Sequence, residues 1–332
     1  MAPAPPTERG QPIPPVLGEA RSRAGLAARR FTPLAVLLAL LGAVGAIEPS
    51  FLSAYALNVL ANESSVILIL ATAQTVVVLL GGIDLSMAAV ASLASVLIAL
   101  ALPAIGPGGV VGVLALTTLI GGVQGLIHTR AQVPSFIVTL AGLGVWSGLA
   151  LTIAPTSVTV AAGYSAVGWL ERNSVGVPNS FSFALAVLVV LAVALRRLPL
   201  GRYIYAIGMA ERAALLSGIR VGRVKTLGFA LTGLFSGLAG MVMVARDSSG
   251  SPTIADSLLL PSVAAVVIGG TSITGGVGGL GCTLIGAMTI TVLRVGFGTI
   301  GLDPAYEPIG YGVLVIAAVA LTIDRSKVQI VK

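Results

Sequence analysis

The side chains best placed to do chemistry in this sequence are carboxylate and hydroxyl groups beside paired glycines. In Gly81-Gly82-Ile83-Asp84-Leu85-Ser86, two glycines end one apolar run and Asp84 stands where the next begins. The Asp84 carboxylate is expected either to accept backbone N–H groups at a helix start or to line a polar path, because ionisable groups at membrane depth are costly and usually functional. Gly82, Asp84 and Ser86 are therefore candidate residues of a substrate path.

A second group of this kind spans 269–281, GGTSITGGVGGLG. Its Gly276-x-Gly278-x-x-Gly281 spacing matches the dinucleotide fingerprint, but that fingerprint needs a preceding strand, and a phosphate-binding loop needs a following Gly-Lys-Ser/Thr. A Gly-rich re-entrant turn that lines a cavity fits the sequence better. Gly270, Thr271 and Ser272 are the candidates there for contact with a polar substrate.

The two paired-glycine motifs also resemble each other. Residues 76–86 (VVVLLGGIDLS) and 264–274 (AAVVIGGTSIT) share an apolar run, Gly-Gly and a short polar step. Duplication of a helical hairpin would explain the similarity, although two hairpins in lipid also look alike by chance.

Covalent and metal chemistry have few residues to draw on. The chain has one His and one Cys, which excludes a disulfide framework, a His-rich metal site and a multi-thiolate site. His128 lies beside Arg130 in a polar turn and is interpreted as solvated, and Cys282 as a small packing residue. No catalytic residues and no metal site are expected, so the chain is predicted not to be an enzyme.

The elements that must position these residues are apolar helices. Of 332 residues, 56% are hydrophobic and 9% charged, whereas soluble domains carry about 25% charge. The predicted fold is an all-α integral membrane protein of about ten transmembrane helices with Gly-rich broken or re-entrant segments. The apolar segments are 34–47, 57–80, 85–102, 109–127, 135–154, 181–195, 227–245, 257–270, 280–300 and 308–323.

Positive charge predicts the orientation of these segments. Sixteen of the nineteen Lys and Arg lie in the N-terminal tail, 128–133, 196–226 and 324–332, which the positive-inside rule places in the cytoplasm with both termini. The net charge of +7 then reflects topology, and no nucleic-acid partner is expected. The predicted outer connections are 48–56, 103–108, 155–180, 246–256 and 301–307. The predicted domains are a disordered tail 1–30, a transmembrane domain 31–326 and a tail 327–332.

Two features leave alternatives open. Arg29-Arg30 before a short apolar run could mark a signal peptide cleaved near Ala46, although a retained first helix is favoured. Arg294 is the one cation inside a span. It is expected to extend to the outer surface, to pair with Asp303 or Glu307, or to face the substrate path.

The 199–226 loop carries a specific pattern besides its cations. Ala210, Ala213, Ala214 and Ser217 recur at i, i+3, i+4 and i+7, which predicts a short helix with a small-residue face. Glu211 lies in its first turn and Gly218 ends it. Such a helix is suited to docking into a partner's groove or, alternatively, to lying on anionic lipid. A bulky residue at position 214 is expected to block docking.

Taken in order over residues 50–326, the motifs resemble those of permease subunits of bacterial ABC sugar importers. The similar branch is the ribose/xylose type, within a superfamily that includes branched-chain amino-acid permeases. The matching motifs are Gly81 to Ser86, Ala206-Ile207-Gly208 through Ala213-Ala214 and Ser217-Gly218-Ile219 to Val221, Gly269 to Gly281, Pro134 to Leu140, and Gly312 to Asp324-Arg325.

The resemblance implies a transporter subunit of the bacterial cytoplasmic (inner) membrane, surrounded by lipid, with 199–226 as the coupling loop. It implies three protein partners: ATPase subunits that hold ATP and Mg²⁺, a second permease subunit (identical or different), and a periplasmic or extracellular solute-binding protein. This chain itself would bind no cofactor. The implied ATPase-coupling residues are Ala210, Glu211, Arg212, Ala213, Ala214, Ser217 and Gly218.

Three features depart from the family pattern. Permeases of this type share the pattern Glu-Ala-Ala followed, after three residues, by Gly. In this sequence Arg212 occupies the Glu position and Glu211 lies one residue earlier. Met209-Ala210 stands where the ribose-type branch usually has Gly-Asn. Arg294 stands where Asn is commoner.

Two alternative functions are considered. The first is an ion-coupled secondary transporter, for which only Asp84 offers a suitable acid. The second is an intramembrane enzyme, for which the sequence offers no set of catalytic residues.

Overall fold

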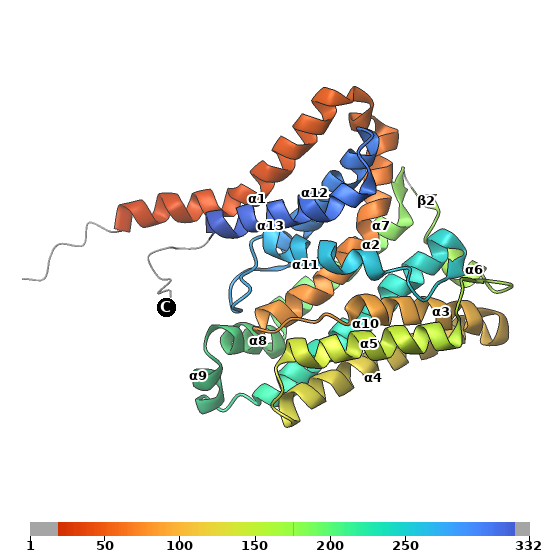
Figure 1. The fold of residues 1–332 in the computed structure, drawn as a ribbon. Helices are drawn as coiled ribbons and strands as arrows, with labels where there is room; N and C mark the ends of the chain where they lie inside the picture. The colour runs from red at the N-terminus through yellow and green to blue at the C-terminus, as the bar shows by residue number, and fades with distance from the viewer. Residues whose placement is uncertain (1–18, 175, 323–332) are drawn as a thin grey trace, which may run out of the picture.

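The computed structural model describes residues 19–174 and 176–322, which are helical almost throughout (Figure 1). The long helices are α1 (Glu19–Ile47), α2 (Ala54–Leu79), α3 (Met87–Ile105), α4 (Pro107–Arg130), α5 (Ser135–Ile153), α7 (Asn179–Arg197), α10 (Val221–Asp247), α12 (Leu280–Thr299) and α13 (Glu307–Thr322). Shorter helices are α6 (Ser165–Gly168), α8 (Pro199–Met209), α9 (Glu211–Leu216) and α11 (Leu259–Ile268), with 3-10 turns η1 (Pro49–Leu52), η2 (Asp256–Leu258) and η3 (Pro304–Tyr306). Two antiparallel pairs join β1 (Val158–Thr159) to β4 (Ser249–Gly250) and β2 (Asn173–Ser174) to β3 (Val177–Pro178).

The described helices are those of a multi-pass membrane protein. Within residues 19–174 and 176–322, seven helices are long and apolar enough to cross a bilayer, namely α2, α3, α4, α5, α7, α10 and α12. Three shorter apolar stretches lie at 31–47, 256–268 and 307–316. The all-helical membrane fold is therefore confirmed. The number of about ten spans stays a prediction, because three of the ten apolar segments fall on the shorter stretches.

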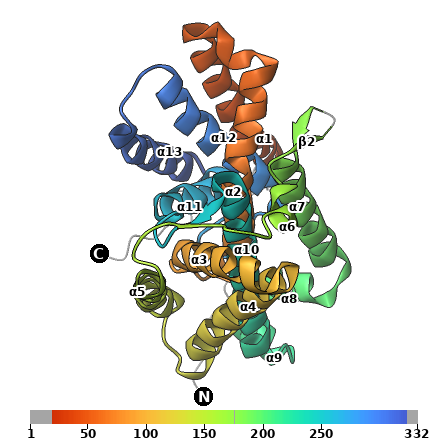
Figure 2. The same cartoon turned by 90° about the vertical axis from the view of Figure 1, so that its right-hand side faces the viewer.

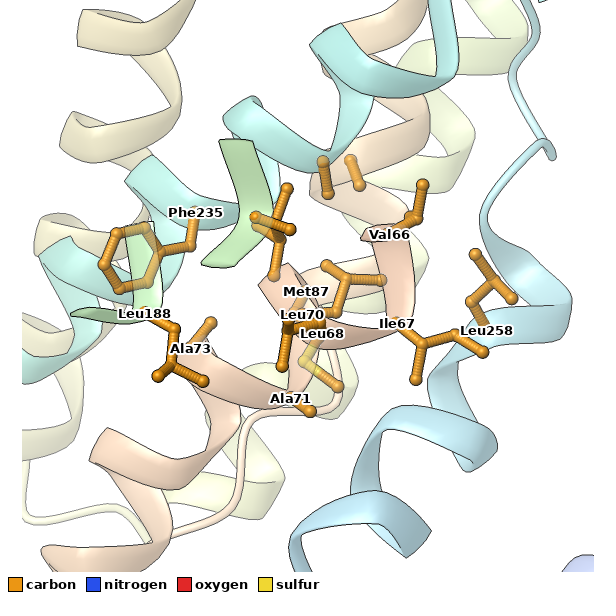
Figure 3. Close-up of a cluster of buried hydrophobic side chains, with 14 of the residues drawn as sticks. Val66, Ile67, Leu68, Leu70, Ala71, Ala73, Met87, Leu188, Phe235 and Leu258 are labelled. Atoms are coloured by element: carbon orange, nitrogen blue, oxygen red, sulfur yellow. The ribbon is translucent and has the colours of Figure 1, made fainter. Parts of the chain in front are cut away.

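Helix α2 is the central element of the bundle. It packs against α7, α10, α11 and α12, and every side chain from Ser64 to Leu79 is buried. Figures 2 and 3 show α2 among these neighbours, with Val66, Leu68 and Leu70 within the buried cluster that also holds Leu188 and Phe235. A helix that is apolar on all sides is buried on all sides, so α2 fixes the positions of the elements around it.

Close packing of α4 on α10 depends on glycines. Gly121 and Gly125 of α4 face α10, and Gly233 and Gly237 of α10 face α4 around Thr117. A Cβ atom on Gly233 would overlap the Thr117 carbonyl oxygen. Small residues four apart on both helices let the two backbones approach closely, which is how apolar helices associate in lipid.

Helix boundaries differ from the sequence expectations in two places. Helix α1 begins at Glu19, so residues 19–30 are helical where a disordered tail was expected; residues 1–18 and the 327–332 tail lie outside the described residues. Helix α10 begins at Val221 instead of 227. Its first turns carry Arg223 and Lys225, and charged side chains do not end a helix whose apolar residues, such as Val224, are buried.

The connection from α10 to α11 runs among the helices instead of over their ends. Ala255 is fully buried, and its N–H donates to Ser92 Oγ of α3 at 3.0 Å. Ser95 Oγ accepts from Ser251 N at 3.1 Å and lies 3.1 Å from the Ser251 carbonyl oxygen. Irregular backbone is tolerated among apolar helices only where such partners satisfy it. Helix α11 then has ten residues, about 15 Å of rise.

Both paired-glycine motifs end a helix in the same way. At the end of α2, Gly81 has φ +78° and Gly82 N donates to Val77 O at 2.9 Å. At the end of α11, Gly270 has φ +91° and Thr271 N donates to the Val266 carbonyl oxygen at 3.1 Å. Each is a Schellman cap, whose left-handed residue favours glycine. The left-handed residue is the first glycine of one pair and the second of the other.

Candidate functional site

Asp84 is buried at the start of α3 and is used there as a capping group. Its carboxylate accepts from Ser86 N at 2.8 Å and from the Ser86 hydroxyl at 2.7 Å, and 3% of the residue is exposed. The N-cap position itself is Ser86, two residues after Asp84. Ser86 Oγ also lies 2.8 Å from the Gln124 amide of α4. Asp84 thus accepts a backbone N–H just before the helix, as expected, but the expectation that it is itself the N-cap residue is wrong.

Helix α5 holds the backbone around Asp84 in place. The Ile83 N–H donates to Ser135 Oγ at 3.1 Å, and the Leu85 N–H donates to Thr139 Oγ1 at 3.0 Å. A Cβ on Gly82 would lie 3.1 Å from Ser135 Oγ. Gly82, Asp84 and Ser86 thus belong to one compact polar joint between α2, α3, α4 and α5. Sequence reasoning missed Gln124 in this joint, although an amide inside an apolar helix is a usable signal.

The second candidate group lies at the end of α11. Thr271 is buried, and its hydroxyl makes no hydrogen bond within the described structure. Ser272 is partly exposed, and its hydroxyl lies 2.8 Å from that of Thr274. Gly270 is partly exposed as well. An unpaired buried hydroxyl is costly, so Thr271 has unused capacity to bind a polar group.

The loop 199–226 and both paired-glycine motifs meet at one joint. The Gly276 N–H donates to the Leu79 carbonyl oxygen of α2 at 3.0 Å. A Cβ on Gly208, near the end of α8, would overlap that same carbonyl oxygen and lie 2.9 Å from Gly276 Cα. A Cβ on Gly275 would lie 2.9 Å from Gly81 N. The loop between α11 and α12, residues 269–279, is called the Gly-rich loop below. We name its contact with α8 and the end of α2 the glycine joint.

Helix α9 forms where the alanine spacing predicts a short helix, with Glu211 in its first turn. Gly218 follows it with φ +82°, and Ile219 N donates to Ala214 O at 3.1 Å, so the predicted cap is present. The small-residue face is divided. Ala210, Ala213 and Ser217 are exposed, whereas Ala214 is buried. Ala214 is therefore not part of the exposed face of α9, and its role in ATPase coupling stays a prediction.

The exposed apolar side chains of this region are leucines instead. Leu216 is 89% exposed and Leu215 is 62% exposed, and α9 lies at an extremity of the molecule in both views (Figures 1 and 2). Glu211 ties α9 to α10 through Lys225, at 2.7 Å. Beside α9 lies a groove of about 460 Å³, whose lining includes Tyr203, Ser217, Gly218, Arg220 and Arg223.

Arg294 belongs to an ion-pair network near the opposite end of α12 from the Gly-rich loop. Its Nε lies 3.6 Å from Glu307 Oε2, and its Nη1 lies 3.7 Å from Glu63 Oε2 of α2. Glu63 also accepts from Arg246 Nη2 of α10 at 2.8 Å. The expected pairing with Glu307 is found, and Asp303 lies outside the ion-pair distance of Arg294. The links of Glu63 to both arginines were not foreseen.

Comparison with known proteins adds the family. The model described as branched-chain amino acid transport system / permease component matches residues 55–319. The chain belongs to this permease family. It is 35% identical over 311 residues to the ribose import permease protein RbsC of Bacillus subtilis (strain 168), covering 90% of this chain and 94% of that protein. It is 33% identical over 307 residues to the fructose import permease protein FrcC of Rhizobium meliloti, covering 87% and 84%. No solved structure matched the chain.

The matched range of this permease contains every candidate named above. The Asp84 joint, the glycine joint, α9 and Arg294 all lie within residues 55–319. The ribose import permease RbsC of Escherichia coli (strain K12) is 34% identical over 301 residues, covering 89% of this permease and 93% of that protein. Such coverage confirms the resemblance to the ribose-type branch over nearly the whole chain.

Proposed function

We propose that this chain is the membrane-spanning subunit of an ATP-driven importer that carries a sugar or a similar small polar solute into the cytoplasm. The observation that carries the proposal is its 35% identity over 90% of its length to a ribose import permease. In this proposal the apolar stretches 31–47, 256–268 and 307–316 also enter the bilayer. That gives about ten spans and places both termini in the cytoplasm, in agreement with the positive charges.

The partner arrangement follows from the same proposal. An ATPase subunit docks on α9 and its groove, where exposed Leu215 and Leu216 offer apolar contact and Arg220 and Arg223 offer positive charge. ATP and Mg²⁺ bind to that partner. A second permease subunit, identical or different, shares the substrate path, and a solute-binding protein delivers the solute to the outer face.

Transport would then be driven by movement of α9. A displacement of α9 reaches α8 directly, and α8 contacts the end of α2 and the Gly-rich loop through Gly208. Because the glycine joint leaves no slack between these backbones, α8 cannot move without moving its neighbours. Docking of the ATPase in its ATP-bound form would favour one arrangement of this joint and its release the other.

The test is uptake by the complete complex in vesicles. Permease, ATPase and binding protein are reconstituted together, and uptake of labelled D-ribose, D-fructose and D-allose is measured with ATP. Uptake that requires both ATP and the ATPase subunit supports the proposal. Uptake that persists without the ATPase on an ion gradient, and that a protonophore abolishes at constant ATP, would identify a secondary transporter and overturn it.

A further inference from the structure

A small cavity lies beside the ion-pair network of Glu63. Its volume is about 150 Å³, and its polar lining comes from Glu63 of α2, Arg246 and Asp247 of α10, Ser257 of η2 and Arg294 of α12. These residues are far apart in the sequence, so the cavity exists only in the assembled bundle. It is separate from the Asp84 joint and from the Gly-rich loop, whose residues do not line it.

The cavity lies at the end of α10, whose last two residues line it, and reaches further along α2 and α12. Glu63 is the tenth residue of α2, about 14 Å along the helix from its first residue at 1.5 Å per residue. One wall is the irregular segment before α11, which includes Ser257 and Ile254 and hydrogen-bonds to α3 on its other side through Ala255. Irregular backbone among membrane helices occurs where it is buried in protein or lines a cavity. This segment lines the cavity through Ser257 and Ile254 and is buried against α3 at Ala255.

Charge in the cavity is dense but balanced. Two guanidinium groups, of Arg246 and Arg294, stand against two carboxylates, of Glu63 and Asp247. A bound anion would be repelled by both carboxylates, and a bound cation would be repelled by both arginines, so the cavity favours neither. The four charged groups satisfy only part of one another's hydrogen-bonding capacity. Arg246 lies 2.8 Å from Glu63, within hydrogen-bond distance, whereas Arg294 lies 3.7 Å from Glu63, beyond it. Donors and acceptors therefore remain for a neutral ligand.

Apolar side chains complete the lining. Met243 and Leu258 contribute to the same cavity, and both are buried. A monosaccharide presents hydroxyl groups around its edge and C–H groups on its faces. Its hydroxyls donate to carboxylates and accept from guanidinium groups, which gives charge-assisted hydrogen bonds, while its C–H faces contact the apolar wall.

We propose that this cavity is a binding site for a neutral polyhydroxylated solute, occupied on the way in from the outer face. The inference rests on the proposed function and adds to it the place where the solute binds. The cavity lies at the ends of α10 and α12 that the charge distribution predicts to face outside. A solute bound there would loosen the Glu63 links between α2, α10 and α12, because it competes for the same donors and acceptors.

The experiment uses protection of a single cysteine in the full complex. Cys282 is the only cysteine of the chain, so Ser257→Cys in a Cys282→Ser background gives one reactive thiol in the cavity. Transport by the Cys282→Ser background is measured first. A membrane-impermeant thiosulfonate is added outside the vesicles, alone or with D-ribose, D-fructose, D-allose, sulfate or choline. The matched control is Ser174→Cys, an exposed residue of β2 outside the cavity.

We expect a sugar to slow labelling of Ser257→Cys several-fold and to leave Ser174→Cys unchanged, while sulfate and choline protect neither. Replacing one charged side chain of the cavity, by Arg246→Gln or by Asp247→Asn, should weaken sugar binding. The sugar concentration that gives half-maximal protection should rise about tenfold, the factor that corresponds to 1.4 kcal/mol. Two variants are used because either change alone could disturb folding, which thermal unfolding of the purified complex would reveal.

Three results would overturn the inference: protection by sulfate or choline but by no sugar, protection by no solute, or a Ser257→Cys thiol that never reacts from outside. These failures are distinguishable from failure of the proposed function. ATP-dependent sugar uptake by the same vesicles would survive them, whereas a wrong proposed function would show as uptake independent of the ATPase, whatever the labelling result.

Discussion

Gly208 of α8 and Gly276 of the Gly-rich loop touch backbone to backbone. A Cβ on Gly208 would lie 2.9 Å from Gly276 Cα and would overlap the Leu79 carbonyl oxygen, which accepts the Gly276 N–H. Three segments separated by long stretches of sequence thus meet with no side chain between them. A movement of α8 therefore acts directly on the end of α2, the central helix, and on the loop that follows α11.

Gly208→Ala tests this joint. The added methyl group has backbone on its far side and cannot be accommodated by a side-chain rotation, so we expect a loss of stability of about 1–3 kcal/mol, typical of overpacking, and a larger loss of ATP-driven uptake. Thermal unfolding and vesicle uptake measure the two effects. The matched control is Gly222→Ala, where a Cβ would lie 3.8 Å from Thr129 Cβ. Equal uptake by the two variants would contradict the role of the joint.

Gly233→Ala should weaken the packing of α4 on α10. Its Cβ would overlap the Thr117 carbonyl oxygen, so the helices must separate, at a cost of about 1–3 kcal/mol. Gly112→Ala on α4 is the control, because a Cβ there has no neighbour within 4 Å and alanine is the better helix former. Thermal unfolding in one detergent compares the two. An unfolding temperature lowered equally by both would refute the packing argument.

Leu216→Ala should reduce binding of the ATPase subunit while leaving the permease folded. Leu216 is 89% exposed, so its truncation creates no cavity, and loss of a central apolar contact costs about 2 kcal/mol at an interface. Affinity of the purified ATPase for the permease in nanodiscs measures the effect. Leu198→Ala, 51% exposed at the start of α8, serves as control. Equal affinities for the two variants would place the docking surface elsewhere.

Ala214→Trp is expected to act differently from Leu216→Ala. Ala214 is 4% exposed, so an indole there must displace the elements packed against it. We predict a lower unfolding temperature, whether or not the ATPase is present. A Trp variant with unchanged unfolding but impaired ATPase binding would instead restore the original expectation that Ala214 faces the partner.

Glu63→Gln should destabilise the ion-pair network by about 1.5–3 kcal/mol, the range for hydrogen bonds to charged groups. Glu63 accepts from Arg246 and lies near Arg294, so its neutralisation leaves like charges facing each other. A double-mutant cycle with Arg246→Gln measures the coupling. The second substitution should recover part of the stability. Asp303→Asn is the control, since the Asp303 carboxylate accepts from the nearby Ala305 N–H and forms no ion pair among the described residues.

Sequence patterns predicted the helices well because apolar runs of span length have few other solutions. The cap at Gly218 was equally local, since a left-handed residue after an alanine-rich turn favours glycine. The direction of the α9 face was not predictable, because periodicity tells which residues share a face and not what covers it. The Glu63 network could not be foreseen for another reason: Glu63 and Arg246 are brought together only by the packing of α2 beside α10.

The dependence of α11 on α3 has a consequence for how the protein is made. With ten residues, α11 is about half as long as a bilayer-spanning helix, so it is a poor substrate for insertion on its own. The backbone before it needs the hydroxyls of Ser92 and Ser95, which are synthesised far earlier. The part of the chain from α11 onward must therefore join a bundle that is already in place, and a ribosome-bound intermediate ending before α11 should already hold α2, α3 and α10 together.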